Sequence, residues 1–294
     1  MVDLTKLRKV FLVGCPRSGT TWLQIILASH PQIASVRETH LFDTYFARLY
    51  QQWHSEASAP NKEGLWVLLD ESELDDAARA FCEVVLRKIA SSKPGATVML
   101  EKTPAHLAHH RLIRRLFPDA MFLHLLRDPR GVVASLLAAH REPWGNWVSG
   151  DATAEARRWR DLVQVGLREL PAYGPATLLV RYESLVTDPQ RALDPIWQWL
   201  GVPPLRYDPD RFSITALVTN GHTAAPLDPA WEVRRNFLRR GLADGWQAEL
   251  TPAQIAAVES TCGDLIEEAG YQRWQPPEPS GPPSAADVAA SSTR

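Results

Sequence analysis

The stretch FLVGCPRSGTTW, residues 11–22, constrains the fold more than any other part of the chain. An apolar run ends at Gly14, a glycine-rich turn follows, and helix-forming residues begin near Thr20. In such a turn successive backbone N–H groups converge on one point, backed by the positive end of the helix dipole. The stretch therefore predicts a strand–loop–helix unit that binds an anion, rather than a turn that only connects two elements.

The loop departs from the Walker A pattern G-x-x-x-x-G-K-[ST] at one position. Gly14 and Gly19 have the required spacing, and Thr21 stands where the magnesium-binding hydroxyl belongs. Thr20, however, occupies the position of the lysine that meets the β- and γ-phosphates of a nucleoside triphosphate. Arg17 offers a planar guanidinium suited to phosphate-like oxygens instead. The loop thus predicts an anion other than a triphosphate bound in the usual way.

Short apolar runs that are typical of buried strands alternate along the chain with segments of helical periodicity. The expected strands are 10–14, 33–36, 97–100, 121–126 and 177–180, and the expected helices are 21–29, 72–91, 108–117, 131–140, 152–170, 189–200 and 252–269. This alternation predicts an α/β fold, a three-layer sandwich with a central parallel sheet. The proline-punctuated stretch 203–236 is expected to be irregular and to form a lid or a binding wall.

Composition bounds the class of protein. The 294 residues are 45% hydrophobic with a net charge of −2, which is typical of a globular enzyme and argues against a general nucleic-acid binder. We find neither a signal peptide nor an apolar run of the roughly 20 residues that span a membrane. Three scattered cysteines, Cys15, Cys82 and Cys262, fit a reducing compartment. We expect a cytoplasmic protein with one domain over 1–274 and a disordered Pro/Ser/Ala-rich tail over 275–294.

Two further basic segments extend the anion-binding prediction. In LHLLRDPRGVVASLL, residues 123–137, Arg127 directly follows an expected strand, and Ser135 lies about two turns into the next helix. Ligands of open parallel sheets bind beyond the carboxyl ends of the strands, so Arg127 shares a rim with the glycine-rich loop. It predicts a second anion site, distinct from the first. The segment VRRNFLRRGLADGW, residues 233–246, offers further cations that can close over one of the two sites.

These motifs together resemble the sulfotransferases that use 3′-phosphoadenosine 5′-phosphosulfate (PAPS) as the donor and release 3′-phosphoadenosine 5′-phosphate (PAP). The resemblance covers roughly residues 9–270 and implies the P-loop-like sulfotransferase fold. It assigns the loop CPRSGTTW to the 5′-phosphosulfate, and it places a tyrosine from RYESLVTDP near the adenine. The donor-binding residues that it implies are Arg17, Ser18, Gly19, Thr20, Thr21, Trp22, Arg127, Ser135, Tyr182, Arg239, Arg240 and Gly241, although DGW here follows in place of the family's GDW.

This donor accounts for the missing lysine. PAPS carries a phosphosulfate and a separate 3′-phosphate, so its protein needs two anion sites rather than one triphosphate cradle. Magnesium that bridges two phosphates has no evident task with such a donor, and we expect no metal. Lys102, in MLEKTPAHL, is the lysine that the resemblance places at the leaving group, where positive charge stabilises the developing anion. A solvated surface lysine is the alternative interpretation.

The acceptor hydroxyl must lose its proton, and three residues are candidates for the general base. Glu38 follows the expected strand 33–36, which places it on the rim beside Lys102, and it resembles the catalytic glutamate of the carbohydrate and protein-tyrosine branches. His106 resembles the histidine of the phenol and steroid branch less closely, because Pro104 and Ala105 intervene. We favour Glu38, with His106 as the alternative and His40 as a bystander; Glu38 paired with Arg37 and His106 as a helix cap are the non-catalytic interpretations.

The acceptor itself is constrained least. We expect a small-molecule hydroxyl, such as a phenol, a sugar or a polyketide alcohol of secondary metabolism, with no nucleic-acid or membrane partner. Five tryptophans in expected loops either line an apolar acceptor pocket or belong to the core: Trp53, Trp66, Trp144, Trp147 and Trp231. The oligomeric state stays open, with a homodimer as one option. Two other functions remain, a small-molecule kinase with a degenerate loop and a non-catalytic nucleotide-binding module.

Overall fold

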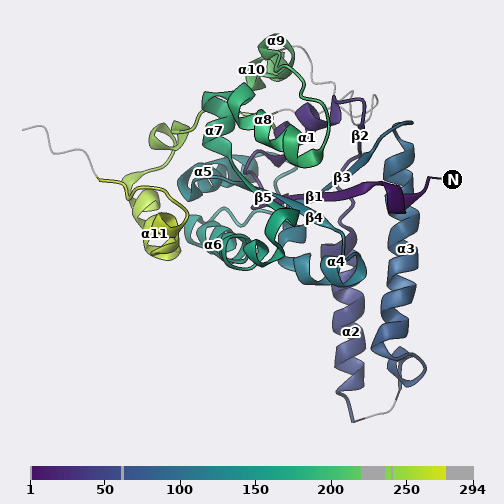
Figure 1. The fold of residues 1–294 in the computed structure, drawn as a ribbon. Coiled ribbons are helices and arrows are strands. Elements are labelled where there is room, and N and C mark those ends of the chain that lie inside the picture. The colour runs from purple at the N-terminus through teal and green to yellow at the C-terminus, as the bar shows by residue number, and fades with distance from the viewer. Residues whose placement is uncertain (1, 61–62, 220–235, 240, 276–294) are drawn as a thin grey trace, which may run out of the picture.

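A parallel sheet forms the centre of the molecule (Figure 1). The structure is a computed structural model that describes residues 2–60, 63–219, 236–239 and 241–275. Within these residues the sheet has five strands in the order β2-β3-β1-β4-β5, and every neighbouring pair is parallel. The strands are β1 (Arg8–Gly14), β2 (Ile33–Ser35), β3 (Val98–Lys102), β4 (Met121–Leu126) and β5 (Thr177–Arg181).

Helices connect the strands and cover the sheet on both faces (Figure 1). They are α1 (Thr20–Ala28), α2 (Ala47–Ala57), α3 (Glu71–Ser91), α4 (His110–Leu116), α5 (Pro129–His140), α6 (Ala152–Arg168), α7 (Tyr182–Thr187), α8 (Pro189–Leu200), α9 (Pro209–Phe212), α10 (Ile214–Thr219), α11 (Pro252–Cys262) and α12 (Leu265–Glu268). Short turns of 3₁₀-helix lie at Leu4–Lys6, Leu65–Val67, Pro104–His109, Leu170–Ala176 and Gly245–Ala248, and a π-helix lies at Leu41–Phe46.

Alternate residues of the central strand β1 build the two cores. Val10 and Leu12 pack with α1 and α8 on one face, whereas Phe11 and Val13 pack with α3 and α4 on the other. This division follows from the two-residue period of a strand, and all four side chains are fully buried. The sheet is therefore the middle layer of three, as the sequence predicts. The register places Leu12 beside Lys102 and Gly14 beside Leu125, so these strands end at one rim.

Several helix starts follow from local sequence. Asp70 and Glu73 form a capping box at the start of α3, and the Asp128 side chain accepts a hydrogen bond from Arg130 N at the start of α5, where Pro129 fills the first position. These bonds satisfy backbone N–H groups that a helix end leaves unpaired. Because α5 begins directly after β4, this cap fixes how the residues beyond β4 meet the rim.

Some predicted bounds are wrong. The single helix expected over 252–269 divides into α11 and α12, because Gly263 adopts a positive φ of 57° between them. The helix expected over 108–117 is preceded by the 3₁₀ turn that Pro104 begins, and α4 itself starts at His110. The stretch 203–219 is not irregular throughout, since it contains α9 and α10. Residues 220–235 and 276–294 lie outside the described residues, so the division into one domain over 1–274 and a tail stays a prediction.

Candidate active site

The glycine-rich loop connects β1 to α1, as the sequence predicts. Gly19 is the residue before the helix and adopts φ 97°, a conformation that glycine favours. A Cβ at this position would lie 2.6 Å from the Tyr182 ring, so a side chain has no room there. Thr20 and Thr21 form the first turn of α1 and line the cavity at the sheet rim. Their backbone N–H groups belong to the helix terminus that favours an anion.

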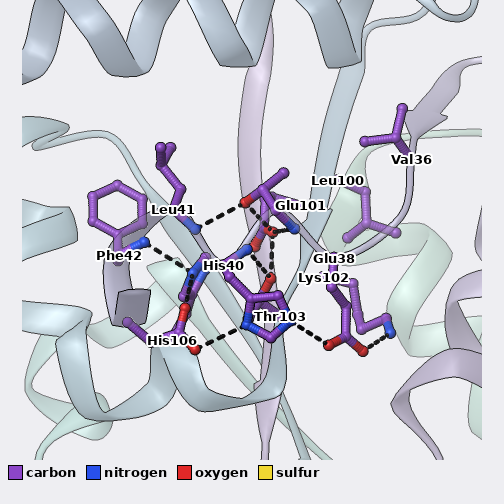
Figure 2. Close-up of polar contacts among 12 residues, drawn as sticks. Val36, Glu38, His40, Leu41, Phe42, Leu100, Glu101, Lys102, Thr103 and His106 are labelled. Carbon is purple, nitrogen blue, oxygen red and sulfur yellow. Dashed lines mark hydrogen bonds and ion pairs between the residues drawn. The ribbon is translucent and has the colours of Figure 1, made fainter. Parts of the chain in front are cut away.

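Lys102 connects the loop to Glu38. The lysine is the last residue of β3, and its side chain is 2% exposed. Its Nζ donates to Thr21 Oγ1 at 3.0 Å. The same Nζ forms an ion pair with Glu38 (Figure 2). The alternative interpretation as a solvated surface lysine is therefore wrong. Glu38 lies three residues beyond β2, the strand that pairs with β3, which explains why the two side chains meet.

The Glu38 carboxylate keeps its negative charge in this environment. Burial alone would raise its pKa, but the charge of Lys102 and hydrogen bonds with His40 and Lys102 lower the pKa to about 2. About a third of the side chain, 32%, remains exposed to the cavity. Hydrogen bonds with Asp43 and Glu38 in turn raise the pKa of His40 to about 10. A Glu38 with so low a pKa is a weak base as long as Lys102 holds it.

His106 lies behind this group and does not line the cavity. Its side chain is fully buried, its Nδ1 is 2.9 Å from Glu101 Oε2, and its Nε2 is 3.3 Å from Asp43 Oδ1. Burial would lower the pKa of His106, but these two carboxylates raise it to about 9. His106 Nε2 also accepts a hydrogen bond from Phe42 N at 3.1 Å, in the first turn of the π-helix Leu41–Phe46 (Figure 2). This contact agrees with the interpretation of His106 as a helix cap. Its role as the alternative base stays a prediction.

A second group of polar side chains surrounds Ser135. Arg17 Nε donates to Ser135 Oγ at 3.1 Å, and Arg17 Nη2 donates to the Phe237 carbonyl at 2.6 Å. Arg127 Nη1 donates to the Arg17 carbonyl at 3.0 Å, and its guanidinium lies 4.0 Å from the Tyr182 ring centre. The sequence places Arg17 with the first anion site, but the structure places its guanidinium with the second. The positive φ of 73° at Arg17 accompanies this orientation.

Positive charge in this group is not fully compensated. Burial and the neighbouring charges of Arg127 and Arg239 lower the pKa of Arg17 to about 10. Arg127 Nε and Ser18 Oγ are buried, and neither has a hydrogen-bond partner among the described residues. Buried polar atoms without partners are rare in proteins and indicate a missing ligand or water. The guanidinium of Arg239 is paired with Glu249 at 2.5 Å.

One cavity of about 670 Å³ unites most of the predicted site. The predicted residues that line it are Arg17, Gly19, Thr20, Thr21, Trp22, Glu38, Lys102, Arg127, Ser135, Tyr182, Arg239 and Gly241. Ser18 and His106 are not part of the lining, and Arg240 lies outside the described residues. Trp144 and Trp147 line the cavity as proposed for an acceptor pocket, whereas Trp53 lines a different one of about 300 Å³. Trp66 lines neither, and Trp231 is not described.

The sequence interpretation missed two carboxylates of the site, Asp43 and Glu101. Asp43 contacts both His40 and His106, and Glu101 accepts hydrogen bonds from Thr39 Oγ1 at 2.8 Å and from the neighbouring threonine of the same strand end. The spacing of His40 and Asp43 is a signal that could have revealed one of these contacts. Glu101 gave a weaker signal, as a charged residue inside an apolar strand.

No group of three or more His, Cys, Asp or Glu side chains has an arrangement that could hold a metal ion in the part of the chain that is described. Among the described helices, none is both long and apolar enough to cross a membrane.

Comparison of the sequence with known families gives a match to the Sulfotransferase family over residues 9–207, which is more than half of the chain. The chain therefore belongs to this family, as the motifs predict. It is 30% identical to protein-tyrosine sulfotransferase 2 of Gallus gallus over 202 residues, which cover 66% of this chain and 51% of that protein. It is 25% identical to the nodulation protein NoeE of Sinorhizobium fredii over 283 residues, 90% of this chain and 66% of that protein. The chain thus spans about half to two thirds of these relatives.

Solved structures share the fold. The sulfotransferase domain of the Synechococcus PCC 7002 olefin synthase has a TM-score of 0.53 at 22% identity, with 88% of this chain and 97% of that chain covered. Mouse sulfotransferase SULT7A1, solved in complex with PAP, has a TM-score of 0.54 at 16% identity, with 89% of this chain and 83% of that chain covered. The predicted sulfotransferase fold, with its central parallel sheet and helices on both faces, is therefore confirmed.

Proposed function

We propose that this member of the Sulfotransferase family transfers a sulfuryl group from PAPS to the hydroxyl of a small-molecule acceptor and releases PAP. The observation that carries the proposal is the division of the cavity's cations into two hydrogen-bonded clusters. Lys102 joins Thr21 and Glu38 in the first, and Arg17 joins Ser135 and Arg127 in the second. PAPS has two separate anionic groups, one for each cluster. The relative solved in complex with PAP supports the same choice of donor.

The first cluster fits the 5′-phosphosulfate. The N-terminus of α1 supplies backbone N–H groups, and Thr20 and Thr21 supply hydroxyls at the cavity wall. Ser18 Oγ is buried beside this turn and does not line the cavity, so we assign the anion contacts to the groups that do. Lys102 brings its positive charge to this cluster through the hydrogen bond to Thr21. We assign this cluster the sulfuryl group and the bridging oxygen.

The second cluster fits the 3′-phosphate and the adenosine. Arg17 and Arg127 are held by carbonyl and hydroxyl acceptors, which fixes their orientation without neutralising their charge. The unpartnered Arg127 Nε is the donor that we assign to a phosphate oxygen. Tyr182 and Trp22, whose ring centres are 6.1 Å apart, supply an aromatic wall for the adenine ring of the donor. Arg239 and Gly241 line the same cavity, and Arg240 is assigned to this end from the sequence alone.

The proposed chemistry uses Glu38 as the base. The acceptor oxygen attacks sulfur, its proton passes to a Glu38 carboxylate oxygen, and the bond from sulfur to the 5′-phosphate oxygen breaks. Lys102 stabilises the charge that develops on the departing phosphate. Binding of the donor gives Lys102 a second anion, which weakens its hold on Glu38. The pKa of Glu38 then rises from its low value, because the charge of Lys102 is the largest of the effects that lower it, with the contacts of His40 next.

The acceptor is assigned by class only. The cavity wall includes Trp147 and Leu242 beside polar residues, which suits a compact acceptor with an apolar body and one hydroxyl. Trp144 lies beside Arg17, whose guanidinium is 5.4 Å from its ring centre, and so belongs to the second cluster. Phenols, sugars and polyketide alcohols remain the proposed classes. The likeness to a protein-tyrosine sulfotransferase adds a tyrosine side chain to the phenols worth testing. The three cysteines are buried and form no disulfide, which supports a reducing compartment such as the cytoplasm.

A transfer assay with sulfur-labelled PAPS tests the proposal. The acceptor panel contains simple phenols, a tyrosine peptide, monosaccharides and secondary alcohols, and Lys102→Met serves as a control that keeps the aliphatic stem. We expect label transfer to at least one class, and a rate lower by about 10²–10³ in the variant. Calorimetry in parallel must show binding of PAP. If PAP does not bind, while ATP with Mg²⁺ supports phosphoryl transfer that EDTA abolishes, the kinase interpretation replaces this one.

A further inference from the structure

Helix α3 carries an apolar stripe that faces solvent. Phe81 and Val84 lie at its middle, and each is 56% exposed. Ala77 and Ala80 are exposed beside them on the same helical face. Single exposed apolar side chains are common, but a contiguous patch of them is unusual on a protein surface. Such patches mark interaction surfaces. Figure 1 shows α3 at the margin of the molecule, with α2 on one side.

The helix does not need this stripe for its own packing. Its buried face consists of Leu74, Ala78, Cys82, Leu86, Ile89 and Ala90, which belong to the core beneath the sheet. That face already satisfies the amphipathic pattern expected of a surface helix. The Phe81 ring touches one neighbour edge-on, the Phe46 ring, with centres 5.7 Å apart. Most of the Phe81 and Val84 surface is left without cover by the described chain.

Charges are distributed along the stripe with opposite sign at its two ends. Glu73 and Asp76 are exposed toward the N-terminal end, and Lys88 is exposed toward the C-terminal end, where Arg87 is paired with Glu83 at 2.5 Å. Lys88 makes no ion pair with any residue in the described part of the chain, and Asp76 is 70% exposed despite its contact with Arg79. The centre of the helix, residue 81 of 71–91, falls within the apolar segment. The stripe is therefore acidic, then apolar, then basic.

We propose that α3 is a homodimer interface, in which the stripe packs antiparallel against the same stripe of a second copy of this chain. A twofold axis between Phe81 and Val84 brings Phe81 of one copy onto Val84 of the other. The same operation places the basic end of each helix on the acidic end of its partner. In an antiparallel pair related by a twofold axis, each end of one helix meets the opposite end of its partner. The two ends must therefore carry opposite charges, and the two ends of this stripe do. The two alanines allow helix axes to approach to the usual 8–10 Å.

Other occupants fit the stripe less well. An all-acidic or all-basic partner would be attracted at one end and repelled at the other. An apolar peptide without charges would leave the ends unmatched. Only a partner with the reversed order of charges matches the whole length, and a second copy supplies one without any further component. The interface lies on α3 and not at the cavity, so it is independent of the proposed reaction.

Sedimentation velocity over a range of concentrations tests the proposal, with the full chain and with Val84→Glu. We expect wild type to form dimers reversibly and the variant to have a dissociation constant at least about tenfold higher, because each dimer then buries two carboxylates in an apolar contact. Leu68→Glu is the matched control: Leu68 is 79% exposed but lies outside α3, and this change should leave the dimer intact. A wild-type chain that stays monomeric at all concentrations contradicts the proposal. So does a dimer that Val84→Glu leaves unchanged.

A second pair of changes tests the antiparallel arrangement itself. Lys88→Glu should weaken the dimer by roughly two- to thirtyfold, since it turns two surface attractions into repulsions. Glu73→Gln should restore much of that loss in the double variant, because Gln still completes the capping box but no longer repels. Far-UV circular dichroism verifies that each variant is folded. If Glu73→Gln relieves none of the Lys88→Glu defect, the two ends do not meet and the proposed packing is wrong.

Discussion

Lys102 and Glu38 form an ion pair in which the lysine is buried and the carboxylate is about one-third exposed, 2% against 32%. The same ammonium also donates to Thr21, a residue of the glycine-rich loop. Lys102 is thus shared between the loop, which binds an anion under the proposed function, and the proposed base. An arriving anion competes with Glu38 for one cation. Donor binding and the basicity of Glu38 are coupled through that competition.

The 3′-phosphate assignment predicts a preference for PAP over AMP that depends on Arg127. Removing the guanidinium in Arg127→Ala takes away a charge-assisted contact worth about 1.5–3 kcal/mol, so PAP affinity should fall roughly 10- to 150-fold. AMP affinity should change much less, because AMP lacks that phosphate. Titration calorimetry measures both, with Arg111→Ala as the control, since Arg111 is exposed and paired with Glu169. Equal affinity of the wild-type protein for PAP and AMP would remove the basis for a separate 3′-phosphate site.

His106 is expected to support the site rather than to act on the substrate. Its removal in His106→Ala leaves the buried Glu101 without the imidazole 2.9 Å away and Phe42 N without its acceptor, and breaking a buried pair of this kind typically costs about 3–5 kcal/mol of folding free energy. The melting temperature should therefore drop, whereas His109→Ala, in the same turn but partly exposed, should have little effect. Turnover per folded molecule, measured well below the melting temperature, should fall less than with a change at Glu38. A His106→Ala protein that is stable but inactive would favour the histidine as the base.

The sheet and its rim could be predicted because they depend on short-range patterns. Apolar runs of four to six residues mark β1, β3, β4 and β5, and the carboxyl ends of parallel strands must share a rim. Glu38, Lys102 and Arg127 were placed on that rim for this reason alone. Helix α2 is not among the predicted helices, although Tyr50 and Trp53, together with Phe46 of the preceding π-helix, have helical spacing. The sequence analysis places Trp53 in a loop, and that interpretation leaves the periodicity unused.

The direction of individual side chains could not be predicted. His106 stands four residues after Lys102, but the 3₁₀ turn that begins at Pro104 directs it into the interior. Arg17 sits inside the first anion loop, yet its left-handed backbone conformation carries the guanidinium to Ser135. Non-glycine residues rarely adopt this conformation, so no sequence rule would assign it to an arginine. Tertiary contacts decide both cases.

His124 predicts a pH-dependent loss of stability. It lies on β4, fully buried, and neither ring nitrogen has a hydrogen-bond partner among the described residues. Burial lowers its pKa from 6.5 to about 4. The unfolded chain then binds the extra proton between pH 6.5 and 4, so the His124 contribution to stability is present above pH 6.5 and is lost as the pH falls toward 4.

The matched variant is His124→Leu, which cannot bind that proton. The wild-type protein should lose about 3 kcal/mol relative to the variant between pH 7 and pH 4, as the shift of the pKa requires. Urea denaturation at several pH values measures the difference, and the comparison cancels the acid-sensitive pairs that both proteins share. Parallel pH profiles for the two proteins would show that His124 acquires a partner in solution.

The sharpest prediction concerns Glu38→Gln, which keeps the shape of the side chain but removes its charge and its basicity. Turnover should fall at least about 10²-fold, the usual value of a positioned general base. PAP should bind at least as tightly as to wild type, because Lys102 no longer has Glu38 as a competing anion. A simple loss of structure would instead weaken both properties together. Stopped-flow transfer with PAPS and calorimetry with PAP give the two values, and Glu268→Gln, which changes a carboxylate paired with Arg168 away from the cavity, is the control. Near-normal turnover in Glu38→Gln would mean that another group takes the proton, and tighter PAP binding without a loss of turnover would leave Glu38 as a partner of Lys102 only.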